Sequence, residues 1–390
     1  DYLTDHVDLA LPLLGDKLAS QEASLRDAAV DLMVSVGEPA VQTLANAAVD
    51  SPMAGRMAAL RGLETLGGDT ARLAVSIAAT DPEAQVRALA VQILVRMGDL
   101  AAAAPLVNDE DRSVCEAAVE ALSDHGILAV QAILDAFEPN LIAPPAQVIR
   151  ALSVFGDVAA QALLTRLSSP TPLHRAGAVS CLCALGHTDT FPQVASLLAD
   201  PDQTVQQTVA DGLVRTGANA VAALVCALTT GDQALVAPAG DCLERLGDCS
   251  VPPLLAAAED RTVERRDAAI DVIARINPVG CASHFVGWLR NNDERMRVAA
   301  ANALKTIHDE AAIPDLLDGI DGDTEPSRDA RLQAICSFGE VAVPLLLERM
   351  EDPAWASSPA LARALATLGD VVEEALLDQG REPGLEIGLG

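Results

Sequence analysis

Residues 81–99 read DPEAQVRALAVQILVRMGD, and this stretch decides the fold. Proline is tolerated only near the start of a helix, so Pro82 separates one helix from the next. The apolar residues from Val86 to Leu94 recur at the three- and four-residue spacing of a helix face. Gly98 then ends the helix, because glycine enters the left-handed backbone region at the least steric cost. The stretch predicts one amphipathic helix with a defined beginning and end.

Helix ends of this kind recur along nearly the whole chain at a spacing of 28 to 31 residues. We call the residue at each end the anchor. The anchors are Gly37, Gly67, Gly98, Gly126, Gly156, Gly186, Gly217, Gly247, Asn277, His308, Gly339 and Gly369. A large aliphatic residue stands four positions before each anchor, and a second apolar helix follows it. The pattern predicts an all-α protein built from about twelve helical hairpins.

The order Asp-Pro, Val-Arg-x-x-Ala and Leu-x-x-x-Gly-Asp within residues 81–99 resembles the short HEAT repeats of the phycobilisome-lyase type. The resemblance covers residues 21–379 and implies a right-handed α-solenoid, a superhelix that serves as a scaffold for protein partners. We therefore expect an N-terminal capping helix in residues 1–20, a repeat array in residues 21–380 and an irregular tail in residues 381–390.

The chain is strongly acidic, with 26 basic and 56 acidic residues and a formal net charge of -30. Nucleic-acid binding rests on clustered Lys and Arg, which this chain lacks, so we expect no nucleic-acid partner. The acidity fits two alternatives, a surface adapted to high salt or one that attracts a basic partner.

Eight cysteines fall mostly within helical patterns rather than in loops, which favours a reduced, cytoplasmic protein. No apolar run approaches the roughly 18 residues that a membrane span requires, so none is expected.

Seven units carry arginine eleven positions before the anchor: Arg26, Arg56, Arg87, Arg175, Arg266, Arg297 and Arg328. A basic ladder for an acidic ligand is one interpretation. We favour the other, in which each arginine pairs with the carboxylate that follows the anchor of a neighbouring unit, and the ladder is architectural.

Two clusters raise the question of metal binding. His174, Cys181, Cys183 and His187 lie close in sequence, but Cys181 and Cys183 diverge around a helix, and Cys181 occupies an ordinary packing position. The acidic segment Asp315, Asp318, Asp321, Asp323 and Glu325 lacks the glutamate that an EF-hand requires and is expected to be a solvated loop. We expect no metal site and no cofactor.

No phosphate-binding loop, nucleophile elbow or zinc-protease motif is found, so no catalytic residue is predicted. The leading hypothesis is a non-catalytic scaffold or adaptor that binds a protein segment, basic or amphipathic, on a concave surface lined by second helices. An adaptor in a prokaryotic signalling or assembly pathway would fit this composition. The alternative, which the repeat resemblance implies, is a bilin chromophore lyase or isomerase, or a subunit of one, with Cys249 or Cys281 as nucleophile.

The few aromatic residues provide candidates for partner contacts, since binding surfaces concentrate energy in Trp, Tyr and Arg. Phe285, Trp288 and Arg290 lie in the second helix of the ninth unit, and Trp355 lies in the turn before the last unit. These four residues are the predicted partner-binding site, although Trp288 also aligns with packing residues of other units.

Overall fold

The computed structural model describes residues 7–352, 355 and 358–378, and every regular element in these residues is a helix. The predicted all-α class is confirmed, and the fold is an α-solenoid. The chain divides into two compact units, residues 1–190 and residues 191–390, which are described separately.

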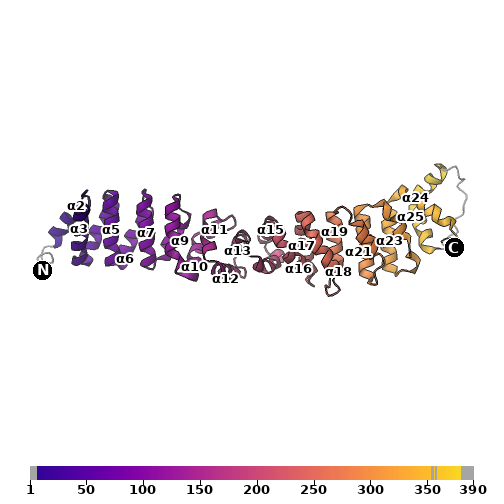
Figure 1. Ribbon diagram of the computed structural model, residues 1–390, viewed down its shortest axis with the longest axis horizontal. Helices are drawn as coiled ribbons and strands as arrows, with labels where there is room; N and C mark the ends of the chain where they lie inside the picture. The colour runs from indigo at the N-terminus through magenta and orange to yellow at the C-terminus, as the bar shows by residue number, and fades with distance from the viewer. Residues whose placement is uncertain (1–6, 353–354, 356–357, 379–390) are drawn as a thin grey trace. The chain divides into compact units, whose positions relative to one another are not determined.

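Unit 1 is a series of hairpins in which first and second helices alternate along the chain (Figure 1). Its first helices are α3 (Ala23–Val36), α5 (Met53–Leu66), α7 (Ala84–Arg96), α9 (Arg112–Ser123), α11 (Ala146–Val154) and α13 (Pro172–Leu185). Its second helices are α2 (Val7–Leu18), α4 (Val41–Asp50), α6 (Gly68–Ala78), α8 (Leu100–Ala103), α10 (Gly126–Ala136) and α12 (Asp157–Arg166). Short 3-10 turns adjoin them: η1 (Glu38–Ala40), η2 (Ala104–Asn108), η3 (Glu138–Asn140) and η4 (Thr188–Thr190).

Unit 2 repeats this alternation, beginning with a second helix. Its first helices are α15 (Gln203–Arg215), α17 (Gln233–Leu246), α19 (Arg266–Ile276), α21 (Glu294–Ile307), α23 (Glu325–Ser337) and the start of α25 (Pro359–Asp378). Its second helices are α14 (Phe191–Ser196), α16 (Ala218–Thr229), α18 (Val251–Glu259), α20 (Ala282–Trp288), α22 (Ile313–Leu317) and α24 (Ala342–Glu351). The 3-10 turns are η5 (Leu197–Ala199), η6 (Gly247–Ser250), η7 (Glu310–Ala312), η8 (Ile320–Gly322) and η9 (Gly339–Val341).

Within each unit the first helices pack against first helices, as α5 does on α3 and α7 and as α19 does on α17 and α21. Second helices pack against second helices in the same way, as α4 does on α6 and α14 on α16. The aliphatic residues four positions before the anchors form the core between these layers, and all are buried: Met33, Leu63, Leu94, Leu122, Leu152, Leu182, Leu213, Leu243, Ile273, Leu304, Ile335 and Leu365. The predicted core positions are therefore confirmed.

The anchors take the positive φ that their sequence role requires, from Gly37 to Gly339. Asn277 and His308 adopt it without the freedom of glycine, at φ 49° and 54°. The His308 ring packs against Phe338, with centroids 5.0 Å apart. Gly369 differs, with φ 10°, and α25 kinks there instead of ending.

A pair of prolines shortens one first helix. Pro144 and Pro145 precede α11, which begins at Ala146, ten residues before its anchor, whereas α7 begins fourteen residues before its own. Pro238, by contrast, lies inside α17. The helix α2 lies within residues 1–20, and its role as a cap stays a prediction. The predicted tail in residues 381–390 lies outside the described residues.

Gly55 shows how closely neighbouring hairpins approach. A Cβ at this position in α5 would press against the Leu18 carbonyl oxygen and lie 2.8 Å from Ser51 Cβ. Gly55→Ala would otherwise favour the helix by up to about 1 kcal/mol. We expect instead a net loss of about 1–3 kcal/mol, because the crowded backbone must move. Urea unfolding followed by circular dichroism measures the change.

The matched control is Gly287→Ala in α20, where a Cβ would meet nothing within 4 Å. This variant should keep or slightly raise the free energy of unfolding. Equal responses of the two variants would contradict the close packing at Gly55.

Candidate functional site

Three ladder arginines, Arg56, Arg87 and Arg297, join the loop in front of their helix to the loop that follows the hairpin. Arg26 and Arg328 bind carbonyl oxygens in front of their own helix. Arg87 donates from Nη1 to the carbonyl oxygens of Asp81 (2.8 Å) and Pro82 (3.1 Å). Its other two nitrogens bind Asp109 in a bidentate pair, at 2.8 Å and 2.7 Å. An ion pair with a carboxylate of the following loop also joins Arg56 to Asp81, Arg266 to Asp293 and Arg297 to Asp323. The ladder is part of the architecture, as we favoured.

The predicted partners of the ladder were wrong. The carboxylates precede the next first helix and do not follow the anchor. The reason is helix length. Eleven residues of helix extend roughly 16 Å, so an arginine in the first turn lies at the opposite end of the helix from the anchor.

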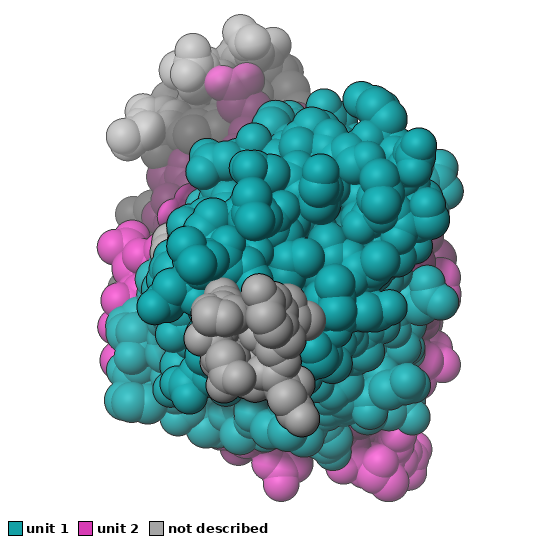
Figure 2. Space-filling view, turned by 90° about the vertical axis from the view of Figure 1, so that its left-hand side faces the viewer, with its two compact units in different colours: residues 1–190 teal, residues 191–390 magenta. Residues whose placement is uncertain are grey.

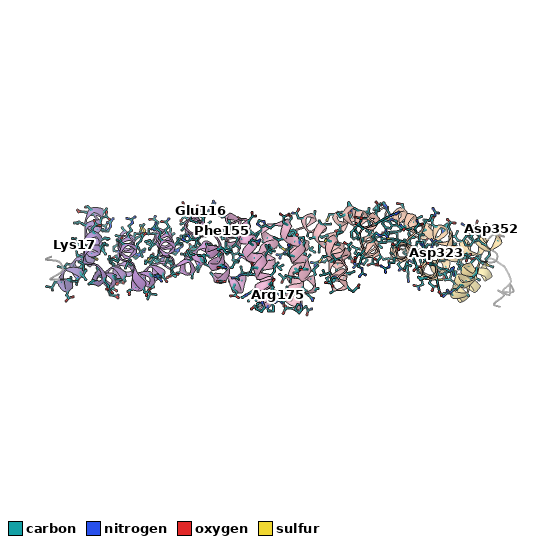
Figure 3. The ribbon with its side chains drawn as sticks, turned by 90° about the horizontal axis from the view of Figure 1, so that it is seen from below. Lys17, Glu116, Phe155, Arg175, Asp323 and Asp352 are labelled. Atoms are coloured by element: carbon teal, nitrogen blue, oxygen red, sulfur yellow. The ribbon has the colours of Figure 1, made fainter. Side chains whose placement is uncertain are left out.

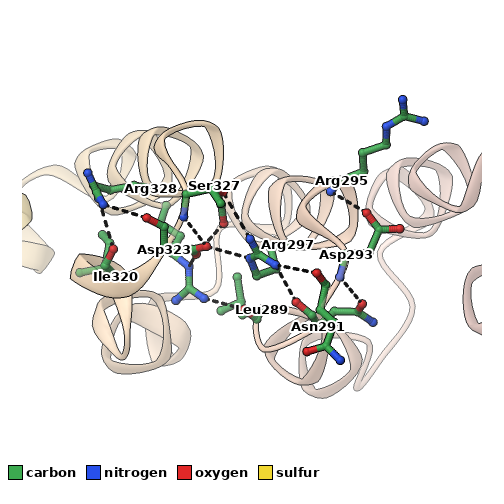
Figure 4. Close-up of polar contacts among 12 residues, drawn as sticks. Leu289, Asn291, Asp293, Arg295, Arg297, Ile320, Asp323, Ser327 and Arg328 are labelled. Atoms are coloured by element: carbon green, nitrogen blue, oxygen red, sulfur yellow. Dashed lines mark hydrogen bonds and ion pairs between the residues drawn. The ribbon is translucent and has the colours of Figure 1, made fainter.

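Asp323 lies at the centre of a buried charged cluster in unit 2 (Figure 4). Its carboxylate accepts hydrogen bonds from Arg297 Nε (2.8 Å) and Ser327 Oγ (2.6 Å), and it lies 3.0 Å from Arg331 Nε. Arg331 is buried and donates to the carbonyl oxygens of Leu289 (2.6 Å) and Asp318 (2.9 Å). The expectation of a solvated acidic loop is therefore wrong at Asp323, because two arginines and a serine replace its water.

Opposing effects act on the pKa values of this cluster. Burial alone would raise the pKa of Asp323, but the hydrogen bonds from Ser327 and the Thr324 amide, with the charges of Arg331 and Arg297, bring it below its usual range. Burial lowers the pKa of Arg331, and Asp323 opposes that shift. The carboxylate is thus held ionised as part of the fold.

Charge is segregated between the two kinds of helix in the first part of unit 2, from α14 to α21, whereas the later second helices α22 and α24 carry charges. The second helices α14, α16, α18 and α20 contain a single charged residue, Glu259. The first helices α15, α17, α19 and α21 each carry charges of both signs, and several pair across neighbours, as Arg245 does with Asp211 and Arg275 with Asp241. In Figure 1 the labels of α15, α17 and α19 lie along the upper side of unit 2, and those of α16 and α18 along the lower side.

The exposed residues of these four second helices form what we call the neutral face, which carries one charge, at Glu259: Pro192, Gln193, Ser196, Ala218, Asn219, Ala222, Cys226, Pro252, Ala256, Glu259, Ser283, His284 and Gly287. Small side chains dominate it, so the backbone of a bound segment can approach closely. A surface with a single charge is unusual in a chain of net charge -30. The sequence did not reveal it, because only the fold shows which side chains of the second helices are exposed.

The predicted partner-binding residues divide into two groups. Phe285 and Trp288 are buried, and their rings lie tilted to one another with centroids 5.9 Å apart, so they support α20 from within. Arg290 is exposed and lies 3.0 Å from Asp318 and 3.4 Å from Asp315. Trp355 is half-buried, with the Arg349 guanidinium 5.3 Å from its ring centroid. Arg290 and Trp355 are the two whose surfaces a partner could reach.

The cysteines that the lyase alternative requires differ in environment. Cys281 is buried, and burial raises the pKa of its thiol, which disfavours the reactive thiolate. Cys249 is exposed and donates to the Leu246 carbonyl oxygen. Cys181 is also buried, which raises its pKa to about 12. Among the residues that the structure describes, no group of three or more His, Cys, Asp or Glu side chains could hold a metal ion.

His174 takes part in a Ser-His-Glu arrangement that the sequence did not reveal. Its Nδ1 lies 3.0 Å from Ser169 Oγ, and its Nε2 contacts Glu138. Ser169 Oγ also accepts a hydrogen bond from the Thr171 amide at 3.3 Å, so the hydroxyl shapes the loop before α13. We read the arrangement as a link between this loop and η3, because turn formation already uses the serine.

Open grooves lie between neighbouring first helices. One of about 660 Å³ between α17, α19 and α21 is lined by charged pairs such as Arg275 and Asp241. Another, of about 410 Å³ between α9 and the shortened α11, is lined by Cys115, Val119 and Glu116, the last of which is labelled in Figure 3. A third, of about 580 Å³, lies between α21, α23 and the start of α25. Acidic and basic side chains are mixed along the first two grooves.

No single helix in the described part of the chain has the length and apolar character needed to cross a bilayer. Two helix pairs, α11 with α12 and α23 with the helices that follow it, meet the length and composition test only when a sharp bend is allowed.

Comparison with known protein families identifies HEAT repeats at residues 160–243 and 251–336. The predicted HEAT repeats are confirmed in these segments, while the short phycobilisome-lyase type stays a prediction. Comparison with curated proteins finds no match.

Solved structures similar to this chain include two of the karyopherin Kap121p. The complex with the extreme C-terminus of the protein phosphatase Cdc14p is 13% identical over 95% of this chain and 47% of that chain, with a TM-score of 0.37. The complex with Nup53p is 13% identical over 96% and 47%, with a TM-score of 0.39. Importin beta is 12% identical over 96% and 68%, with a TM-score of 0.31. The chain spans about half the length of the Kap121p structures.

Proposed function

We propose that this chain is a non-catalytic scaffold that binds a segment of another protein on the neutral face of unit 2. The observation that carries the proposal is the segregation of charge. Four successive second helices contain one charged residue, whereas the first helices beside them are rich in charges. Interface centres are depleted in charged residues and surrounded by a polar rim.

The partner that suits this face is an amphipathic segment. Small and apolar side chains would contact Ala222, Ala256 and Gly287, and their burial would drive binding. Basic residues at the edges of the segment would be attracted by the acidic remainder of the chain. Arg290, at the edge of α20, would form an ion pair with an acidic residue of the segment in place of its pair with Asp318.

The cytoplasm is the compartment we propose, in a prokaryotic signalling or assembly pathway. The eight free cysteines support a reducing setting, and the acidic composition suits a cytoplasm of high salt. The bilin lyase alternative would have to rely on the exposed Cys249, because the Cys281 thiol is buried.

Charge placed on the neutral face tests the proposal. Affinity capture from native lysate at two salt concentrations identifies the partner by mass spectrometry, and calorimetry then measures its affinity. We expect the double variant Ala222→Glu/Ala256→Glu to bind about tenfold or more weakly, because unpaired carboxylates would be buried. The control Ala237→Glu places one carboxylate on the exposed side of α17, and the single variant Ala256→Glu is its match in charge. The control should change the affinity less than about twofold.

Circular dichroism establishes that the variants keep their helices. Equal affinities of the double variant and wild type would overturn the neutral face as the binding site. An eluate that carries a bilin or a phycobiliprotein, detected by visible absorbance, would overturn the non-catalytic proposal.

A further inference from the structure

The arginine ladder is interrupted at two successive hairpins of unit 1, the unit coloured teal in Figure 2. Eleven residues before the anchors of these hairpins, Cys115 stands in α9 and Pro145 stands in front of α11. The Cys115 thiol donates to the Asp109 carbonyl oxygen at 3.1 Å, but a cysteine is too short to reach the loop that follows the hairpin, as Arg87 does. The first turn that carries the ladder arginine elsewhere is missing from α11, because the helix starts after the proline.

The groove of about 410 Å³ between α9 and α11 lies at this gap in the ladder. Its buried lining residues are apolar, Val107 and Cys115, and Val154 of α11 adds an aliphatic side chain that is 56% exposed. Figure 3 labels Glu116 on α9 and Phe155, the residue after Val154. The volume falls within the roughly 300–1,000 Å³ that is usual for binding pockets. The groove is therefore large enough to bury side chains of a bound molecule.

A second row of ion pairs, further along the first helices, is also incomplete here. In this row an arginine two residues before its anchor pairs with a carboxylate of the preceding first helix: Arg96 with Glu64, Arg245 with Asp211 and Arg275 with Asp241. The corresponding residue of α11 is Val154. On α9, Glu120 stands six residues before its anchor, as Asp211 and Asp241 do before theirs. Among the residues that the structure describes, none forms an ion pair with the exposed Glu120 carboxylate.

The charges around the groove determine what can enter it. Glu116 already pairs with Arg112 at 2.6 Å, and Arg87 binds the acidic loop in front of α9. Glu120 is thus the carboxylate available to a cation from outside. Arg150, exposed on the α11 wall, would repel a second positive charge. An occupant with one cationic group and an apolar part complements this arrangement.

We propose that the groove binds a segment of a partner protein through one arginine and an apolar residue beside it. The guanidinium pairs with Glu120, and the aliphatic stem of the arginine packs on Val154. The partner thus supplies the arginine that α11 lacks. The neighbouring apolar residue covers Val119 and Cys115. This site belongs to unit 1 and does not depend on the neutral face of unit 2.

The first test uses the full chain and a fluorescent peptide with blocked ends, Gly-Ser-Leu-Arg-Leu-Ser-Gly, near physiological salt. A second peptide carries citrulline, which has the shape of arginine without its charge. Fluorescence anisotropy measures the affinity of both peptides for wild type and for Glu120→Gln. We expect Glu120→Gln to weaken binding of the arginine peptide about three- to tenfold. Binding of the citrulline peptide should change less than about twofold, because the coupling requires both charges.

The second test places the missing arginine in the chain itself. In Val154→Arg the new guanidinium would pair with Glu120 and its stem would fill the groove, so the arginine peptide should bind about tenfold or more weakly. The control Val158→Arg adds the same charge at an exposed aliphatic residue of α12, outside the groove. It should bind the peptide within about twofold of wild type.

Circular dichroism establishes that the variants keep their helices. An equal loss of both peptides in Glu120→Gln would overturn the proposal, and so would equal binding by Val154→Arg and Val158→Arg. A wild-type chain that does not bind the arginine peptide, or that binds the citrulline peptide as tightly, would overturn it as well.

Discussion

Arg331→Met is expected to lower the free energy of unfolding by about 3–5 kcal/mol, because removal of one partner from a buried ion pair leaves the other partner's polar groups unsatisfied. Arg331 lies 3.0 Å from Asp323 and donates to the carbonyl oxygens of Leu289, Leu316 and Asp318. Methionine fills similar space but donates no hydrogen bond. Urea unfolding gives the overall loss, and hydrogen exchange should locate it in residues 289–335.

Arg363→Met is the matched control, since Arg363 pairs with Asp329 at 2.8 Å but both side chains are largely exposed. Its loss should stay below about 1 kcal/mol. The pKa of Asp323 is lowered in the fold, so its contribution to stability is present at neutral pH and is lost as the pH falls through that pKa. The difference between wild type and Arg331→Met should therefore narrow in acid. Two results would contradict this account. One is a larger loss of stability in Arg363→Met than in Arg331→Met. The other is a stability difference between wild type and Arg331→Met that widens in acid.

Arg87→Met is expected to cost a similar amount, about 3–5 kcal/mol, because it leaves the buried Asp109 carboxylate without its cation. The hydrogen bond with Asp109 raises the pKa of Arg87, so the arginine is charged in the fold. The variant also frees the carbonyl oxygens of Asp81 and Pro82, which Arg87 binds in the preceding loop. Thermal and urea unfolding measure the loss, and hydrogen exchange should place it in α7 and α9.

A second substitution separates charge from packing. In Arg87→Met/Asp109→Asn the buried charge is gone, while the asparagine oxygen can still accept the Asp111 amide hydrogen bond. We expect this double variant to be more stable than Arg87→Met alone by about 1–3 kcal/mol. Arg96→Met removes a more exposed pair with Glu64 and should cost less than about 1 kcal/mol. If Asp109→Asn brings no recovery, the loss comes from packing and the carbonyl contacts.

The candidate site was less predictable than the fold. Aromatic residues drew attention to α20, but Phe285 and Trp288 are buried, and the surface beside them is built from residues as plain as Ala222 and Gly287. Composition reports a net charge and does not reveal its distribution over two kinds of helix. Exposure depends on which helices pack together, and no local pattern around Ala222 signals it.

The sequence by itself determined the all-α class, the hairpin period and the buried residue four positions before each anchor, because these depend on local properties such as helix termination and apolar spacing. Only the tertiary structure decided which carboxylates Arg56 and Arg87 bind, and that Asp323 is enclosed by Arg297 and Arg331. The physical reason is that these properties arise between hairpins. Residues distant in sequence meet there through packing, and each hairpin's surface is defined by its neighbours.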